Sequence, residues 1–153
     1  MAVYNEAKTY QAGVLGAKVD RATAALPATT AAALFTVSGG RVAITQIVGE
    51  VTTVIQTQAN NTKLTANPTT GTSVDICAVL DISADEVGTL YGITGVAADA
   101  LIGVNAGGLS GQDRPVVVNE GTIDLVCAAT NTGAVKWTLF YVPIDEGASV
   151  VAA

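Results

Sequence analysis

Apolar and polar residues alternate along most of the chain in short runs separated by glycine, proline and asparagine, a pattern typical of β-strands joined by turns. Eight to ten short strands of this kind, with almost no helical period, predict an all-β fold, either an antiparallel β-sandwich or a jelly-roll-like barrel. We expect one such β-domain over residues 13–153. The clearest runs predict strands at 18–26, 32–38, 41–55, 63–66, 73–80, 90–94, 116–118, 122–129 and 135–142.

The first turn with a distinct signature is Gly39-Gly40, which stands between two β-branched runs. Two glycines there favour a two-residue hairpin, because both turn positions need a positive φ. The hairpin register would set Val37 opposite Val42 and make one face of both strands apolar. The long second strand changes its apolar face after Val48, which predicts a bulge or bend at Gly49.

A second hairpin is expected at Asn131-Thr132-Gly133, where glycine occupies the position that favours a left-handed residue. Its register would pair Cys127 with Trp137, and the neighbouring pairs on the same face are apolar too. We therefore expect this hairpin to form a wall of the core, with Trp137 buried. The opposite face presents Asp124, Val126, Lys136, Phe140 and Val142, and its mixed character indicates that something covers part of it.

Both ends of the chain are candidate contact segments. Residues 1–12 show no sustained period and are expected to form an N-terminal arm, either a frayed terminus or an arm anchored on a neighbouring subunit through two tyrosines. Residues 148–153 are apolar and predict a docked edge strand or a contact with a neighbour. The candidate interaction residues are therefore Tyr4, Tyr10, Phe140, Val142, Val150 and Val151.

Charge is scarce in this chain. Charged residues make up 13% of the sequence, about half the share of roughly 25% in an ordinary soluble domain. Such a domain covers itself with small polar side chains or hides its surface against other chains. The seven lysines and arginines are scattered and form no stripe that would follow phosphates, so no nucleic-acid partner is expected. No uninterrupted apolar run reaches the roughly 18 residues of a membrane span, so no membrane partner is expected either.

The sequence predicts no catalytic site, metal or cofactor. It contains no histidine, which removes the commonest general base and metal ligand. Asp81-x-Ser83-x-Asp85 copies the start of a calcium loop, but Glu86 stands where that loop needs glycine, which favours an acidic turn. Paired carboxylates drawn from Asp81, Asp85 and Asp124 remain the one hydrolase hypothesis.

Two cysteines, Cys77 and Cys127, lie far apart in the sequence on predicted strands. Their spacing excludes the common zinc and redox-pair motifs. Cys127 is expected to be a small buried hydrophobe, since no histidine is present to activate it. Whether the two thiols pair depends on whether their strands are neighbours.

Three segments, FTVSGGRVAITQIVGEVTT (35–53), KLTANPTTGTSVDICAVLDI (63–82) and GTIDLVCAATNTGAVKWTLFYVPIDEGASVVAA (121–153), are similar to a family of small virion structural proteins of tailed bacteriophages. The resemblance implies a structural role as a decoration or cement protein on the capsid surface, assembled in the bacterial cytoplasm. The implied partners are the major capsid protein of the same phage and copies of the chain itself, as a trimer or other cyclic oligomer. The resemblance carries no site residue, and it leaves head and tail locations open.

The alternative function is a tail or adsorption module that contacts the host surface through loops. Its natural contact region would be the glycine-rich excursion at 103–113, because binding residues often lie on loops held by a rigid scaffold.

Overall fold

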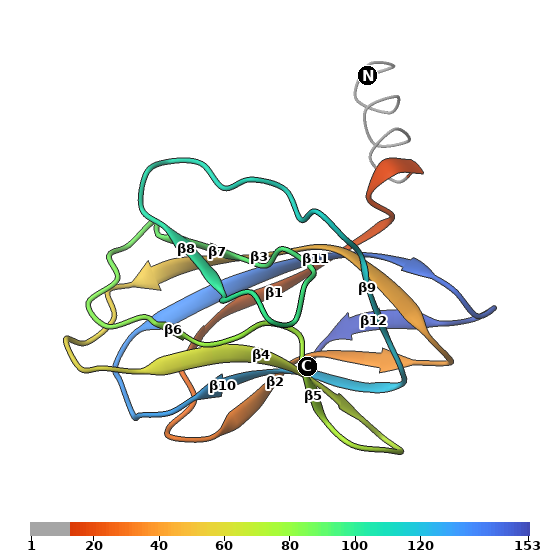
Figure 1. Ribbon diagram of the computed structural model, residues 1–153, viewed down its shortest axis with the longest axis horizontal. Helices are drawn as coiled ribbons and strands as arrows, with labels where there is room; N and C mark the ends of the chain where they lie inside the picture. The colour runs from red at the N-terminus through yellow and green to blue at the C-terminus, as the bar shows by residue number, and fades with distance from the viewer. Residues whose placement is uncertain (1–12) are drawn as a thin grey trace.

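The computed structural model describes residues 13–153, which form two antiparallel β-sheets packed against each other (Figure 1). The predicted all-β sandwich is therefore confirmed. Sheet A contains, in spatial order, β1 (Ala17–Ala25), β11 (Ala134–Pro143), β3 (Val42–Thr53), β7 (Leu90–Gly92) and β8 (Ile102–Val104), with β9 (Val116–Val118) also paired to β3. Sheet B contains β12 (Ser149–Ala152), β2 (Ala31–Ser38), β10 (Gly121–Cys127), β4 (Asn61–Pro68) and β5 (Val74–Asp75), with β6 (Leu80–Asp81) also paired to β4.

The strand pairs are nested along the chain. Strand β1 pairs with β11, β2 with β10, β3 with β9 and β4 with β5, all antiparallel. The chain thus behaves as one long hairpin that wraps around the core and changes sheet at successive turns, which is jelly-roll-like connectivity. The last strand, β12, adds to this scheme by pairing with the outer side of β2.

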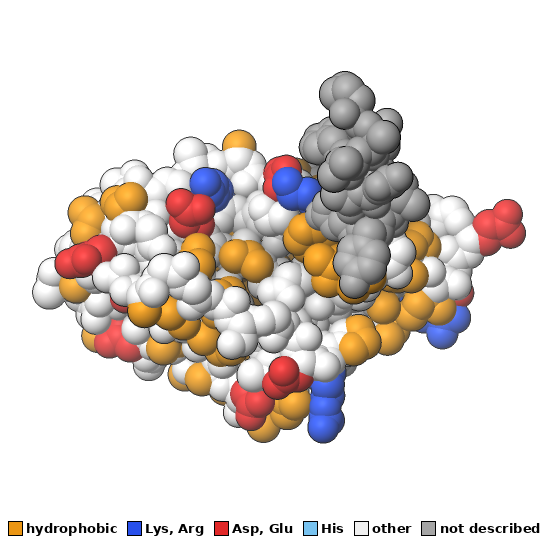
Figure 2. Space-filling model, turned by 90° about the horizontal axis from the view of Figure 1, so that it is seen from above, with side chains coloured by type: hydrophobic (Ala, Val, Ile, Leu, Met, Phe, Trp, Pro, Cys, Tyr) orange, Lys and Arg blue, Asp and Glu red, His pale blue; other side chains and the backbone are white. Residues whose placement is uncertain are grey.

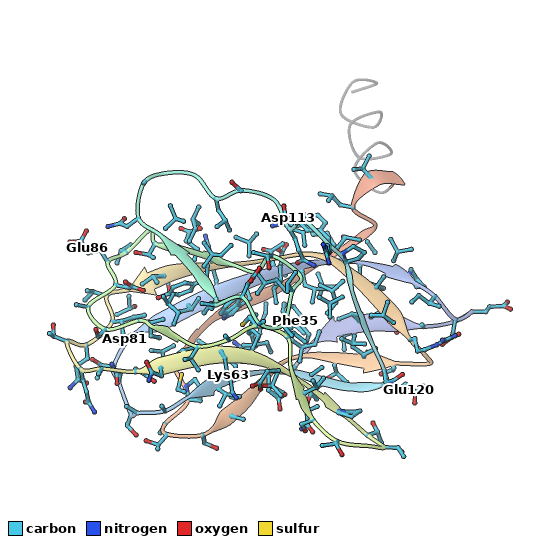
Figure 3. All side chains as sticks on the ribbon, viewed as in Figure 1. Phe35, Lys63, Asp81, Glu86, Asp113 and Glu120 are labelled. Carbon is cyan, nitrogen blue, oxygen red and sulfur yellow. The ribbon has the colours of Figure 1, made fainter. Side chains whose placement is uncertain are left out.

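One hydrophobic core fills the space between the sheets. Phe35 of β2 points into it (Figure 3), and it is joined there by inward side chains of both sheets. Full burial of each large apolar side chain contributes about 1.5–3 kcal/mol. The largest fully buried side chains include Trp137, Tyr91, Phe35, Leu34, Ile44, Ile47, Leu64 and Ile123.

Both predicted hairpins are wrong, because each turn crosses from one sheet to the other. Val37 pairs with Gly121 and Val150 in sheet B, whereas Val42 pairs with Val118 and Pro143 in sheet A. The same holds at the second turn, where β10 belongs to sheet B and β11 to sheet A. Matching apolar faces arise equally from two strands of a hairpin and from two strands that face each other across a sandwich, so the pattern could not separate them.

The glycines of these turns do have the backbone conformation that the sequence predicts. Gly39, Gly40 and Gly133 have φ values of +79°, +135° and +140°. At the first corner a Cβ on Gly39 would lie 2.5 Å from the carbonyl oxygen of Gly147, so glycine is needed for the close approach as well.

The predicted bulge at Gly49 is also misplaced. The register of β3 against β11 shifts at Thr45 and Thr52, whereas Gly49 is regularly paired between Trp137 and Tyr91. The rings of those two residues stack with centroids 6.2 Å apart. Gly49 is present because any side chain there would enter the Trp137 ring, not because the strand bends.

The remaining differences concern the middle of the chain. The predicted strand at 73–80 is broken into β5 and β6, with only two residues in each. The apolar C-terminal residues dock as the edge strand β12, as predicted. In residues 13–153, no helix has the length and apolar character needed to cross a bilayer.

Candidate interaction surface

The candidate contact residues near the C-terminus separate onto two sides of β12. Val150 points into the core and is only 4% exposed, so it holds β12 in place and presents nothing to a partner. Val151 is 55% exposed on the outer side of sheet B. Tyr4 and Tyr10 lie outside the described residues.

Phe140 and Val142 lie on the outer face of sheet A, not on one face with Asp124, which belongs to sheet B. Val142 is exposed and Phe140 half-buried. The chain entering β1 crosses this region: Thr45 Oγ1 donates a hydrogen bond to the Leu15 carbonyl oxygen. Part of this face is therefore covered by the chain itself.

A longer segment covers another part of the outer face of sheet A. The connection between β8 and β9 arches over the sheet (Figure 1). The backbone amide of Gln112 donates a hydrogen bond to Gln46 Oε1 at 2.8 Å, and the Leu109 side chain packs against Gly92. The glycine-rich excursion is thus tied down at both residues, with open space around Gly107 and Gly108.

The outer face of sheet B is different, since no described segment runs across it in Figure 1. Its side chains follow from the strand register and the alternation of side chains along each strand. We call this surface the B face. It consists of Ala31, Ala33, Thr36, Lys63, Thr65, Asn67, Asp75, Thr122, Asp124, Val126 and Val151.

The B face is flat because nearly all of these side chains are small, and it carries almost no free charge. Its one cation, Lys63, donates to Asp75 Oδ2 at 2.7 Å. This hydrogen bond is the main reason why the pKa of Asp75 lies below its usual value. Positive and negative charge therefore cancel at this edge of the face.

Asp124 is the remaining charge, and it lies sunk in the middle of the B face. It is 7% exposed, between Ala33 and Thr65 on the neighbouring strands. Its Oδ2 accepts a hydrogen bond from Asn67 Nδ2 at 3.2 Å, whereas Oδ1 has no partner within the described part of the chain. A buried acceptor without a partner costs about 1–3 kcal/mol, so it favours a donor from outside.

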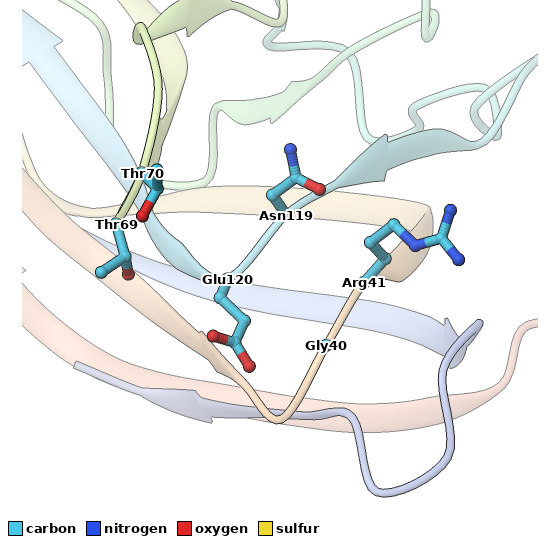
Figure 4. Close-up of a pocket in the computed structure, with 6 residues that line it drawn as sticks. All are labelled: Gly40, Arg41, Thr69, Thr70, Asn119 and Glu120. Atoms are coloured by element: carbon cyan, nitrogen blue, oxygen red, sulfur yellow. The ribbon is translucent and has the colours of Figure 1, made fainter.

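Two hollows lie where the sheets meet beside β9. One is an open cleft of about 380 Å³ lined by Gly40, Arg41, Thr69, Thr70, Asn119 and Glu120 (Figure 4). The other hollow, of about 100 Å³, is also lined by Asn119. Val74 and Val117 border it, and their side chains are 59% and 58% exposed. Apolar side chains exposed at this strand edge form a second, smaller contact candidate.

An ion pair fixes the corner beside the first cleft. Arg41 binds Asp145 through two side-chain hydrogen bonds of 2.9 and 2.7 Å, and its backbone amide donates to the same carboxylate. These bonds hold the pKa of Asp145 well below its usual range. The guanidinium is thus occupied by the chain's own acid. Figure 2 views the molecule from above, on the side of sheet A, where charged side chains are scattered singly among apolar and uncharged ones.

The acids of the hydrolase hypothesis are engaged in separate structural roles. Asp81 Oδ1 accepts from the backbone amides of Asn60 and Ser83. Asp85 accepts from the buried Tyr91 hydroxyl at 2.5 Å, and burial raises the pKa of this carboxyl. Asp124 lies on the B face. None of the three lines the hollows beside β9.

The two cysteines are free thiols, and both are buried. They flank β4: the Leu64 amide donates to Cys77 Sγ, and Thr62 Oγ1 donates to Cys127 Sγ. Burial raises the pKa of both thiols, which keeps them in the neutral form. The interpretation of Cys127 as a buried hydrophobe agrees with this placement.

Comparison with protein-family models, with curated proteins and with solved structures finds no match to this chain. The functional argument therefore rests on its surfaces. The B face was missed by sequence reasoning because both turns were interpreted as hairpins, which placed Asp124 and Lys136 on one face. The available signal was the alternation along β10, where the outward residues Thr122 and Asp124 stand between residues that point into the core.

Proposed function

We propose that this protein is a structural component of a bacteriophage virion, a decoration protein that binds the outside of the capsid across neighbouring capsomers. The observation that carries the proposal is the B face, a flat and nearly uncharged surface in a chain with 13% charged residues. A solitary domain has no physical need for such a face, whereas a repeated shell component buries it.

The size of the B face supports a shared contact. The four longest of its five strands, β12, β2, β10 and β4, lie about 4.8 Å apart. With up to about seven residues each at 3.3 Å they give at most roughly 450 Å², against about 800 Å² per partner in a stable interface. The B face therefore supplies about half of a stable contact. The rest would come from the exposed valines beside β9 or from the arm at residues 1–12.

The stabilising effect would follow from mass action. A protein that binds the assembled lattice and not the separated capsid subunits raises the free energy needed to rupture the shell. Buried apolar area contributes roughly 25 cal/mol per Å², reduced by the loss of side-chain freedom on binding.

The proposal is tested with capsids that lack this protein. Ala33→Arg puts a bulky cation on the B face next to the free Oδ1 of Asp124, which can pair with it, so the variant keeps its fold. We expect it to lose capsid binding. Val87→Glu, a charge added at an exposed valine before β7, is the matched control and should bind like the wild type.

The result that overturns the proposal is equally concrete. Either full capsid binding by Ala33→Arg, or capsids that rupture at the same temperature with and without the protein, would remove the cementing role. The adsorption alternative is favoured instead if the protein binds host-surface glycans and labels only the tail.

A further inference from the structure

The free edge of β1 carries a pattern that fits a second copy of itself. Within residues 13–153, β1 pairs only with β11, so the hydrogen-bonding groups along its other side are open. None of its nine side chains is buried on either face. Even Val19, which lies on the side nearer the core, is only half-buried.

The charges on this edge are arranged about Val19. Lys18 precedes it and Asp20 follows it, and their side chains form an ion pair of 3.0 Å on the outer face. Thr138 Oγ1 donates to Asp20 Oδ1 at 2.8 Å and orients that carboxylate. Both charged side chains are about half-exposed, so they are accessible to a neighbour.

We infer that two copies of the protein associate through antiparallel pairing of their β1 edges, with Val19 opposite the partner copy's Val19. In this register each Lys18 stands opposite the Asp20 of the other copy, which gives two cross-copy attractions. Ala17 then stands opposite Arg21, a small side chain beside a long one. The neighbouring symmetric registers centre on Lys18 or on Asp20, and each sets two like charges directly opposite each other, which disfavours them.

The contact extends over residues 17–21 and ends where β1 changes register. The register of β1 against β11 shifts between Arg21 and Ala24, and this irregularity bends the strand so that the residues after it cannot pair with the second copy. Because this edge is short, the contact buries less area than a standard interface. We therefore expect a concentration-dependent dimer with a dissociation constant in the micromolar range. If the protein sits on a capsid, neighbouring copies would meet at a high effective concentration. The inference itself does not depend on that location.

Sedimentation velocity over a range of concentrations tests the inference on the full chain. The wild type is expected to form dimers. Lys18→Asp sets two acids against two acids and should weaken the dimer at least tenfold, whereas the charge swap Lys18→Asp with Asp20→Lys should restore it. Arg114→Asp makes the same change of charge at an exposed cation in the connection between β8 and β9, outside β1 and its partner strand β11, and it should leave the dimer unchanged.

A cross-linking experiment checks the register. Val19→Cys should form a disulfide between copies under mild oxidation, because the two positions face each other. Ala22→Cys is the matched control, since its two copies would lie about 20 Å apart at 3.3–3.4 Å per residue and should not cross-link.

Four results would overturn the inference. The first is a monomer at every concentration, and the second is a charge swap that fails to restore the dimer although its melting temperature is that of the wild type. The third is stronger association of Lys18→Asp, because Lys18 would then guard the edge against pairing. A trimer would also contradict it, since a contact between identical edges closes at two copies. Capsid binding by Ala33→Arg is scored separately, so failure of one proposal leaves the other standing.

Discussion

Gly49 is the position where the smallest substitution should have the clearest effect. It lies in the middle of β3, paired with Trp137 on one side and with Tyr91 on the other. A Cβ added to Gly49 would lie 2.8–3.0 Å from three carbons of the Trp137 ring. The ring cannot withdraw easily, because it is 2% exposed and stacked on Tyr91.

The magnitude for Gly49→Ala follows from two opposing effects. Overpacking in a filled core costs typically 1–3 kcal/mol, because side chains leave their preferred rotamers. Replacing glycine by alanine returns about 0.4–1 kcal/mol by restricting the unfolded chain. We therefore expect a net loss of about 1–2 kcal/mol, which lowers the melting temperature by about 2–8 °C for a domain of this size.

The assay is denaturant unfolding followed by fluorescence, and Trp137 is the only tryptophan, so the signal comes from the perturbed site. Gly108→Ala is the control, since a Cβ there meets nothing within 4 Å and should change stability by less than about 0.5 kcal/mol. If Gly49→Ala is as stable as the wild type, the packing argument for the Trp137–Gly49–Tyr91 arrangement is refuted.

Further predictions concern titrating groups and thiols. The Arg41 contact that lowers the pKa of Asp145 stabilises the fold above the carboxyl's unfolded pKa, and this stabilisation is lost as the pH falls towards the folded pKa. Asp145→Asn should therefore reduce the acid dependence of the melting temperature. An unchanged dependence would argue against the Arg41 contact. The raised pKa of Asp85 has the opposite sign, because stability falls as the pH rises from the unfolded towards the folded pKa. Asp85→Asn, which can still accept from Tyr91, should therefore be at least as stable at pH 7 as the wild type, and a large loss measured by thermal melting would contradict this. The two cysteine thiols should react with a disulfide reagent slowly in the native protein and rapidly in denaturant; fast native labelling would show that they are not buried.

The strands themselves could be predicted because alternation is a local property. Strands β1, β2, β3, β10 and β11 appear within a few residues of the predicted ranges. Their assignment to sheets could not be predicted, because Val37 and Val42 are apolar for the same reason whether they pair or face each other across a core. The long-range pairing of β10 with β2 and β4 decides the matter, and no local signal records it.

The candidate surface was predictable only in part. Scarcity of charge predicted a surface of small polar side chains or one hidden against another chain, but not which part of the fold would carry it. Val151 and Val142 are exposed, and their role as contact residues stays a prediction, whereas Val150 points inward from β12 and packs in the core. The B face needed the sheet order, because its members come from five strands spread over residues 31–151.

The most direct test of the proposed role is a cryo-electron microscopy map of phage particles assembled with this chain. Our account predicts copies in the hundreds on the outside of the head, each with Thr36, Thr122 and Val126 turned toward the shell. Density confined to the tail, or copies on the head that turn sheet A inward and leave the B face in solvent, would contradict it.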